Sequence, residues 1–231
     1  MIDLAQRLRT DEQMDDPALD DATYAAVLAD LARVNRWTLA GRPTLGFLAR
    51  AARDMPAFRL LDVGFGQGDM LRRIARWARR RGIAVDLVGV DLNAASVGVA
   101  RAATPIGMPI EYRAGDYEAQ PTPFDFVVSS LVAHHMTDEE LTAFIRYMER
   151  MGTRGWLIND LHRHRFAYLG FPLLARLLGA HRIVREDGQL SIARAFRPAE
   201  WRDILAQAGV PADAARIVRR FPFRLCVERL R

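Results

Sequence analysis

The sequence predicts a single α/β domain built on a doubly wound, largely parallel sheet. Short apolar segments alternate with helical patterns from about residue 55 onward, which is typical of such sheets. The first apolar segment leads into a glycine-rich loop that opens a helix, an arrangement that brings backbone N–H groups to a ligand. With 231 residues, half of them apolar, the chain is long enough for one large core. We expect this core over residues 55–231, with an N-terminal helical cap over residues 1–54.

The N-terminal part is predicted to change from loose chain to helix. Residues 1–20 are expected to be loosely structured, because acidic residues and Pro17 interrupt any pattern. One helix is predicted from Ala22, with its apolar residues on one face, and a second from Thr44 to about Arg53.

The core strands are predicted as short apolar runs that end in polar residues or glycine. They are Arg59–Val63, Val85–Val90, Ile110–Ala114, Phe124–Ser129 and Gly155–Ile158, followed by a hairpin of Arg216–Phe221 and Arg224–Glu228. Apolar spacing predicts helices over residues 70–81 and 138–151, the second with Thr137 as its N-cap, and a further helix from Pro198.

An insertion over residues 161–197 is predicted to form a lid. Its strongly apolar stretch, residues 166–178, is too short to span a bilayer and predicts a helix interrupted at Gly170 and Pro172. We expect it to wall an apolar pocket, with docking on a membrane surface as the alternative. Polar residues then return, and Asp187, Ser191 and Arg194 are candidates either for the pocket wall or for solvent exposure.

Composition argues against a nucleic-acid partner and against a membrane span. The formal net charge is +5 and every basic residue is arginine. The arginines between residues 72 and 81 fall opposite the apolar positions of their helix, which favours a solvated face over a phosphate-binding patch. No apolar run reaches a membrane-spanning length, and the first residues lack the apolar centre of a signal peptide. The single cysteine, Cys226, is expected to fill core space and fits a reducing cytoplasm.

The glycine loop carries the most specific motif of the chain. Gly64, Gly66 and Gly68 run G-x-G-x-G after Asp62, while Asp69 stands where a dinucleotide fold needs its third glycine. D-x-G-x-G-x-G resembles motif I of the class I S-adenosylmethionine-dependent methyltransferases. The resemblance implies that the loop passes under the amino-acid part of this cofactor, with Asp62 acting on its amino group directly or through water. The alternative is a glycine-rich turn without a ligand.

Further residues match the same family in order and spacing. Asp91 and Leu92 end the second strand, where the resemblance implies contacts to the ribose. Asp116 and Tyr117 follow the third strand, where an acid accepts from the adenine amino group and the next side chain packs on the ring. Ser129 and Ser130 end the fourth strand and complete the expected cofactor contacts. The implied fold is a seven-stranded Rossmann-like methyltransferase sheet with an antiparallel last strand.

Histidines follow the strands at which methyl donor and acceptor meet in this fold. His134 and His135 come after the fourth strand and are candidate general bases, because a phenol or enol must lose a proton before it attacks a methyl group. The alternative is that they only fill space. His162 follows the fifth strand, and the Asp160 carboxylate is placed to fix its tautomer. No metal site is expected, since serines stand where a metal-dependent catechol-type enzyme carries an acid.

The outer segments indicate the acceptor side. N-R-W-x-L-A-G-R near the start and N-D-L-H-R-H-R with D-G-Q-L-S later look similar to a bacterial subgroup linked to polyketide and quinone tailoring. The expected function is methyl transfer to a hydroxyl of a small aromatic or polyketide-like acceptor. The alternatives are C-methylation of a quinol-type ring, a catalytically silent cofactor-binding module and a NAD-type reductase. The sequence does not indicate an oligomeric state. The candidate acceptor-binding residues are Arg36, Trp37, Asp160, His162, Arg163, Tyr168 and Arg194.

Overall fold

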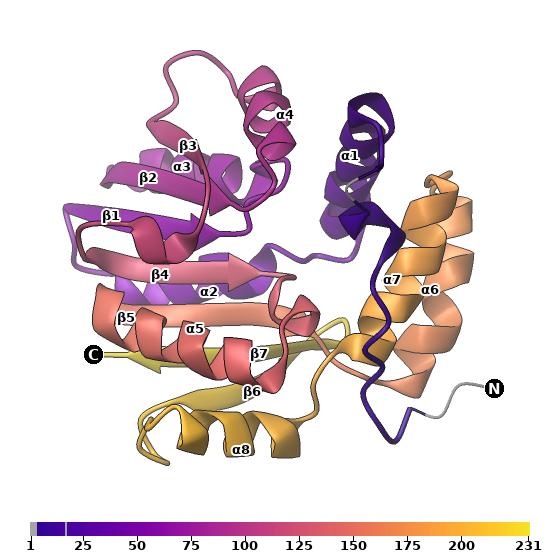
Figure 1. Cartoon of the computed structure of the whole chain (residues 1–231). Helices are drawn as coiled ribbons and strands as arrows, with labels where there is room; N and C mark the ends of the chain where they lie inside the picture. Colours follow the sequence, from indigo (N-terminus) through magenta and orange to yellow (C-terminus); the bar gives the residue numbers. More distant parts are fainter. Residues whose placement is uncertain (1–3, 17) are drawn as a thin grey trace.

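A seven-stranded sheet runs through the protein in the order β3-β2-β1-β4-β5-β7-β6 (Figure 1). The computed structural model describes residues 4–16 and 18–231; residues 1–3 and 17 of the expected cap lie outside the described part. Strands β1 to β5 are parallel, and β7 is antiparallel to both β5 and β6, so the predicted fold class is confirmed. The strands are β1 Ala57–Val63, β2 Ala84–Asp91, β3 Ile110–Ala114, β4 Phe124–Ser130, β5 Gly152–Leu161, β6 Arg216–Arg220 and β7 Arg224–Leu230.

Helices cover both faces of this sheet because successive strand residues point to opposite sides. Leu60 of β1 packs in the core beneath α2, α3 and α4, whereas its neighbour Leu61 packs beneath α5 and α8. The helices are α2 Arg42–Ala51, α3 Asp69–Arg80, α4 Ala95–Ala103, α5 Asp138–Met151 and α8 Pro198–Gln207. The predicted Thr137 cap of α5 is present as a full capping box with Glu140.

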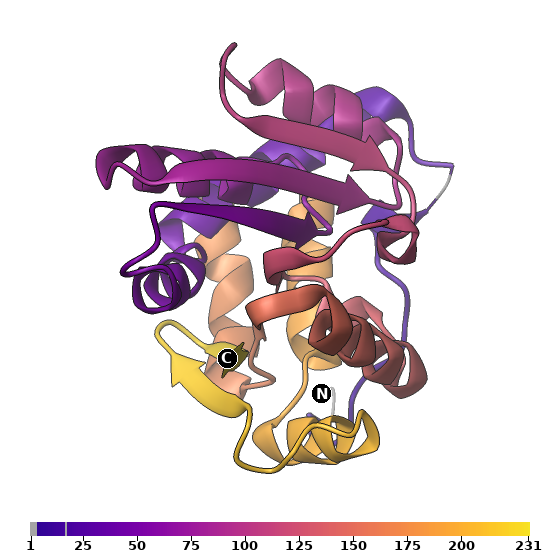
Figure 2. The ribbon, with the colours of Figure 1, turned by 90° about the vertical axis from the view of Figure 1, so that its left-hand side faces the viewer.

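A separate helical layer lies beyond the carboxyl ends of the strands. It consists of α1 (Asp21–Trp37), α6 (Arg165–Leu177) and α7 (Arg182–Arg194), and in Figure 2 the strands stand in front of the orange α6 and α7. Val27 of α1 packs there with Ala175 of α6 and Val184 of α7 in a small core of their own. We use the name cap for these three helices, in place of the segment 1–54 that the sequence predicted as a cap. The second N-terminal helix, α2, belongs instead to the sheet core through Phe47 and Leu48.

Helix α6 is continuous where the sequence predicted an interruption. Pro172 lies inside it, and its ring nitrogen cannot donate to the carbonyl of Tyr168 four residues earlier. The Gln189 side chain of α7 donates to that carbonyl at 3.0 Å, so the neighbouring helix satisfies the group that proline leaves free. The expected break at Gly170 and Pro172 is therefore wrong for a reason of tertiary structure.

The N-terminal segment, residues 4–16, is also better ordered than predicted. Its backbone follows α7 (Figure 1), with the Leu8 amide donating to the Ala193 carbonyl at 3.2 Å. Arg163 and Arg197 both donate to the Leu4 carbonyl, at 3.1 and 2.6 Å. These arginines tether a segment that has no helical or strand periodicity of its own. Within the described part of the chain, no helix is both long and apolar enough to cross a membrane.

Candidate active site

A cavity of about 690 Å³ lies between the carboxyl ends of the strands and the cap. Its position beside β1 and β4, where the strand order reverses, is the usual ligand site of an open α/β sheet. The glycine loop forms one wall, and the cap with the turn between β6 and β7 forms the opposite one. The predicted site residues among those lining it are Asp62, Gly64, Gly66, Asp91, Leu92, Tyr117, Ser130, His134 and His135.

The three loop glycines adopt left-handed backbone conformations, with φ of +75° at Gly64, +51° at Gly66 and +73° at Gly68. A Cβ atom at Gly64 would collide with the Val132 side chain, and one at Gly68 with the Tyr112 hydroxyl. Gly66 is the roomier of the three and faces the cavity. Gly64 and Gly68 are thus required for close packing of the loop, and Gly68 lies outside the cavity wall.

Beside the glycine loop, two buried polar atoms have no hydrogen-bond partner among the described residues. Asp62 Oδ1 and Ser130 Oγ are both inaccessible and make no hydrogen bond. Burial, with the charges of Asp69 and Asp91, raises the pKa of Asp62 well above its ordinary value. Buried polar groups are normally paired, so these two atoms fit a ligand that brings its own donors.

The other predicted cofactor residues differ in what they contact. Asp91 accepts from the Gly66 amide at 2.9 Å and the Asn93 amide at 3.0 Å, which fixes the loop against β2. Tyr117 packs on Phe144 and Tyr147 of α5 and borders the cavity. Asp116 and Ser129 lie outside the wall: Asp116 is exposed and accepts from the Glu118 amide, and Ser129 Oγ donates to the Val63 carbonyl.

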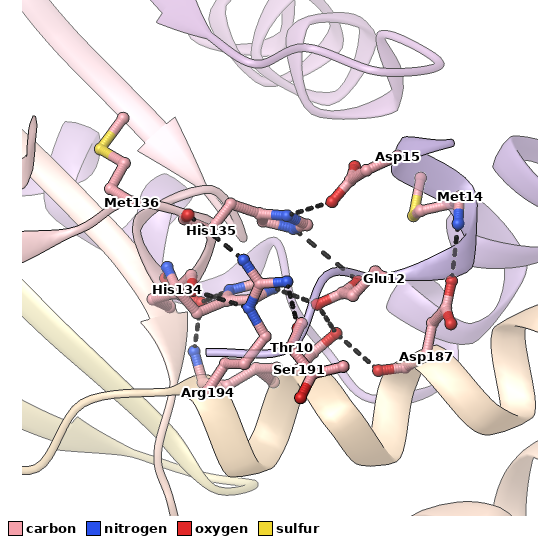
Figure 3. Close-up of polar contacts among 12 residues, drawn as sticks. Thr10, Glu12, Met14, Asp15, His134, His135, Met136, Asp187, Ser191 and Arg194 are labelled. Carbon is pink, nitrogen blue, oxygen red and sulfur yellow. Dashed lines mark hydrogen bonds and ion pairs between the residues drawn. The ribbon is translucent and has the colours of Figure 1, made fainter. Parts of the chain in front are cut away.

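A polar cluster on the opposite side combines His134, His135 and Glu12 (Figure 3). His134 Nδ1 lies 2.7 Å from Asp160 Oδ1, and the His134 amide donates to the same carboxylate at 2.8 Å. His135 Nδ1 lies 2.9 Å from Asp15 Oδ2. The Nε2 atoms of both rings face the Glu12 carboxylate, at 3.6 Å from His134 and 3.9 Å from His135.

The charges of this cluster shift its pKa values in a consistent direction. Burial alone would lower the pKa of His135, but the Asp15 hydrogen bond and the Glu12 charge outweigh it and hold that pKa above its ordinary value. Burial alone would raise the pKa of Asp160, but the His134 interactions outweigh it and lower that pKa. Asp160 therefore stays ionised beside His134, not beside His162 as predicted from the sequence.

Sequence reasoning missed Glu12 and Asp15. Both come from the segment read as loose chain, where D-E-Q-M-D-D carries no periodicity that would place it at a site. Arg194 fixes this segment: it donates to the Thr10 carbonyl at 2.8 Å and to the carbonyls of His134 and His135, each at 3.2 Å. Its guanidinium thus fixes the backbone that carries these side chains and is not part of the cavity lining.

The remaining predicted acceptor residues also lie outside the cavity wall. Arg163 is buried and bound to Glu200 and to the Ala195 carbonyl. His162 has a pKa lowered to about 4 by burial and by Arg219, which keeps it neutral near pH 7. The other candidates outside the lining are Arg36, Trp37, Asp160 and Tyr168.

Arg224 is a buried cation at the wall that sequence reasoning did not single out. Its Nη2 donates to Thr38 Oγ1 at 3.2 Å, while its buried Nη1 has no partner among the described residues. Burial lowers the pKa of this guanidinium to about 10, so it remains charged.

Comparison with known proteins agrees with this fold and loop. The methyltransferase domain family matches residues 60–155. The chain is 31% identical over 169 residues to a ubiquinone biosynthesis O-methyltransferase of Chelativorans sp. (strain BNC1), covering 70% of this chain and 62% of that relative. It therefore spans less than two thirds of the relative's length.

Solved structures share the fold at low sequence identity. Magnesium protoporphyrin IX methyltransferase (ChlM) from Synechocystis PCC 6803 with bound SAH matches with a TM-score of 0.56 and 18% identity over 95% of this chain and 91% of that one. The plantazolicin methyltransferase BpumL in complex with SAH matches with a TM-score of 0.65 and 14% identity, covering 94% and 92%. Residues 60–155 thus match the methyltransferase domain family, and the fold is shared with methyltransferases solved with bound SAH.

Proposed function

We propose that this protein transfers a methyl group from S-adenosylmethionine to a hydroxyl of a small acceptor with an apolar, aromatic body. The observation that carries the proposal is the continuity of the cavity. One volume of about 690 Å³ reaches from Asp62 and the glycine loop to the histidine cluster and the apolar face of α6. Such a volume is in the range of sites that enclose small organic ligands.

The donor would lie on the glycine loop. The partnerless atoms Asp62 Oδ1 and Ser130 Oγ suit its amino-acid part, and Asp91 and Tyr117 suit its nucleoside. When bound there, S-adenosylmethionine supplies a methyl group already activated on a sulfonium. The protein's contribution is then to position the acceptor and to remove its proton.

The acceptor would lie beneath the cap. Phe166, Phe171 and Leu174 of α6 provide an apolar wall, while His134 and His135 provide the polar point where a hydroxyl can be held. Arg224 offers a buried charge that suits an acceptor bearing an anionic or carbonyl group. The relative named as an O-methyltransferase of ubiquinone biosynthesis supports transfer to a ring hydroxyl.

Mass spectrometry of a panel of phenols incubated with the protein and S-adenosylmethionine tests the proposal. A mass gain of one methylene on a phenol is the expected result, with binding of S-adenosylmethionine and not of NADH in titration calorimetry. If histidine chemistry removes the proton, His135→Ala is expected to lower turnover by about two to four orders of magnitude while leaving cofactor affinity nearly intact. His181→Ala serves as the matched control, because that side chain is exposed and lies outside the cavity lining.

Absence of methyl transfer to every phenol, together with binding of S-adenosylmethionine, would refute the proposed acceptor class. Unchanged turnover in His135→Ala and in His134→Ala would remove histidines from proton transfer.

A further inference from the structure

We propose that Glu12, His134 and His135 form a binding site for a divalent transition-metal ion at the acceptor end of the cavity. The side chains each offer one ligand atom, and these three atoms lie within 4.8 Å of one another (Figure 3). All three residues line the cavity, so the remaining coordination positions of an ion would face the ligand space.

The distances between the three ligand groups are too long for hydrogen bonds and close to the spacing of ligand atoms around a metal ion. His134 Nε2 and His135 Nε2 lie 3.6 and 3.9 Å from the Glu12 oxygens, beyond hydrogen-bonding range. Ligands about 2.1 Å from a tetrahedral ion lie about 3.4 Å from one another. Small side-chain rotations would therefore bring the two nitrogens and one carboxylate oxygen around a common centre.

The outer contacts orient the rings as metal-binding histidines are usually oriented. Asp160 Oδ1 lies 2.7 Å from His134 Nδ1, and Asp15 Oδ2 lies 2.9 Å from His135 Nδ1. Each carboxylate fixes the tautomer with its proton on Nδ1, which turns the Nε2 lone pair toward Glu12. Glu12 is itself held, because Ser191 Oγ donates to its Oε1 at 2.8 Å.

The charges around the cluster favour a cation. Glu12, Asp15 and Asp160 bring three carboxylates to the two imidazoles. Against them stand the guanidiniums of Arg7 and Arg194, which bind the backbone carbonyls behind the rings. Three negative charges against two leave the surroundings net negative when the imidazoles are neutral.

The donor set selects the kind of ion. Two imidazoles and one carboxylate suit Zn²⁺, Fe²⁺ or Co²⁺, whereas Mg²⁺ and Ca²⁺ prefer oxygen ligands only. Binding of the ion does not depend on methyl transfer; its use rests on the proposed function. An ion here would lower the pKa of an acceptor hydroxyl that it contacts, with the proton leaving to solvent, so the histidines would act as ligands in place of a base.

Metal titration of the 231-residue chain, first stripped with a chelator, tests the site. Zn²⁺ is titrated against a chromophoric chelator, and Co²⁺ is followed by its visible absorption. One equivalent of Zn²⁺ per chain is the expected result. We expect Glu12→Gln and His135→Ala to weaken affinity by at least about a hundredfold, and Asp15→Asn by about ten- to a hundredfold through the orientation of His135.

His181→Ala is the matched control. His181 is exposed and lies outside the cavity lining, and its Nδ1 accepts from the Ile183 amide at the start of α7. Its Zn²⁺ affinity should equal that of the wild type. Circular dichroism establishes that each variant is folded, and Asp15→Asn decides the matter if a ligand variant does not fold. Two results would overturn the proposal. One is binding of less than one equivalent of Zn²⁺ by the folded wild type; the other is a Zn²⁺ affinity in His135→Ala and in Asp15→Asn equal to that of the wild type.

Two measurements on the same stripped protein separate this inference from the proposed function. Binding of S-adenosylmethionine and methyl transfer without added metal would uphold the methyltransferase even if Zn²⁺ does not bind. Stoichiometric Zn²⁺ binding without methyl transfer to any phenol would uphold the metal site and refute the acceptor class.

Discussion

Asp62 combines burial at the cavity wall with a carboxylate oxygen that has no hydrogen-bond partner in the described part of the chain. Its raised pKa means that the native state holds a proton which the unfolded chain releases as pH rises past the ordinary value of 3.8. The native state without ligand is therefore favoured below that pH and loses stability as pH rises toward the raised pKa. The Asp62 carboxylate, which we propose binds the cofactor, thus lowers the stability of the ligand-free fold near neutral pH.

The substitution Asp62→Asn removes this ionisation while keeping the side chain's shape. We expect the ligand-free variant to be about 1–3 kcal/mol more stable than the wild type at pH 8, with the difference shrinking toward pH 4. Urea denaturation at pH 5 and pH 8 measures it. Asp203→Asn on the exposed face of α8 is the control and should show no such pH dependence. An equal difference at both pH values for Asp62→Asn would contradict the argument.

At the scale of elements, one glycine determines how closely α6 and α7 approach. A Cβ atom at Gly188 of α7 would collide with the ring of Phe171 in α6, whereas one at Gly170 of α6 meets nothing within 4 Å. Phe171 also lines the cavity, so the contact between these helices sets the shape of the acceptor wall.

Gly170→Ala and Gly188→Ala therefore form a matched pair. Gly170→Ala should raise the free energy of unfolding by about 0.5–1 kcal/mol, since alanine is the better helix former and the site has room. Gly188→Ala should lack this gain and should raise the KM for the acceptor, because it displaces the Phe171 ring. Thermal unfolding and steady-state kinetics compare the two. Equal gains in stability with unchanged KM in both variants would show that the helices do not depend on this contact.

Local sequence pattern predicts some of these elements and not others. Strands β1 to β5, the capping box at Thr137 and the glycine loop follow from local periodicity and turn chemistry, and the structure has them. The continuity of α6 depends on Gln189 reaching Tyr168, a contact between helices that periodicity does not encode. Most of the residues predicted to contact the cofactor line the cavity, because the motif lies next to its strand. Glu12 and Asp15 were missed because long-range arginine contacts, and not local pattern, place them.

At the scale of the whole molecule, the N-terminal segment joins the cap to the sheet. Arg7 donates to Asp138 at 2.9 Å and to the Arg194 carbonyl at 2.6 Å, so one side chain connects the start of α5 with the end of α7. Arg194 in turn binds the Thr10 carbonyl and the backbone of both histidines. The position of Glu12 in the cavity therefore depends on arginines that do not touch the cavity themselves.

Arg194→Met tests whether this residue positions the segment or contacts the acceptor. Methionine keeps the apolar stem but leaves the Thr10 and His135 carbonyls without this donor, while the His134 carbonyl keeps only Arg7. We expect a loss of about 3 kcal/mol in the free energy of unfolding, and amide hydrogen exchange over residues 8–14 faster by about an order of magnitude or more. Arg182→Met, on the exposed side of the same helix, removes only a surface ion pair with Glu186 and should change neither measurement appreciably. A raised acceptor KM with wild-type stability and exchange would instead make Arg194 a direct acceptor contact. In that case, the wall that carries Glu12 would be held by the remaining arginines alone.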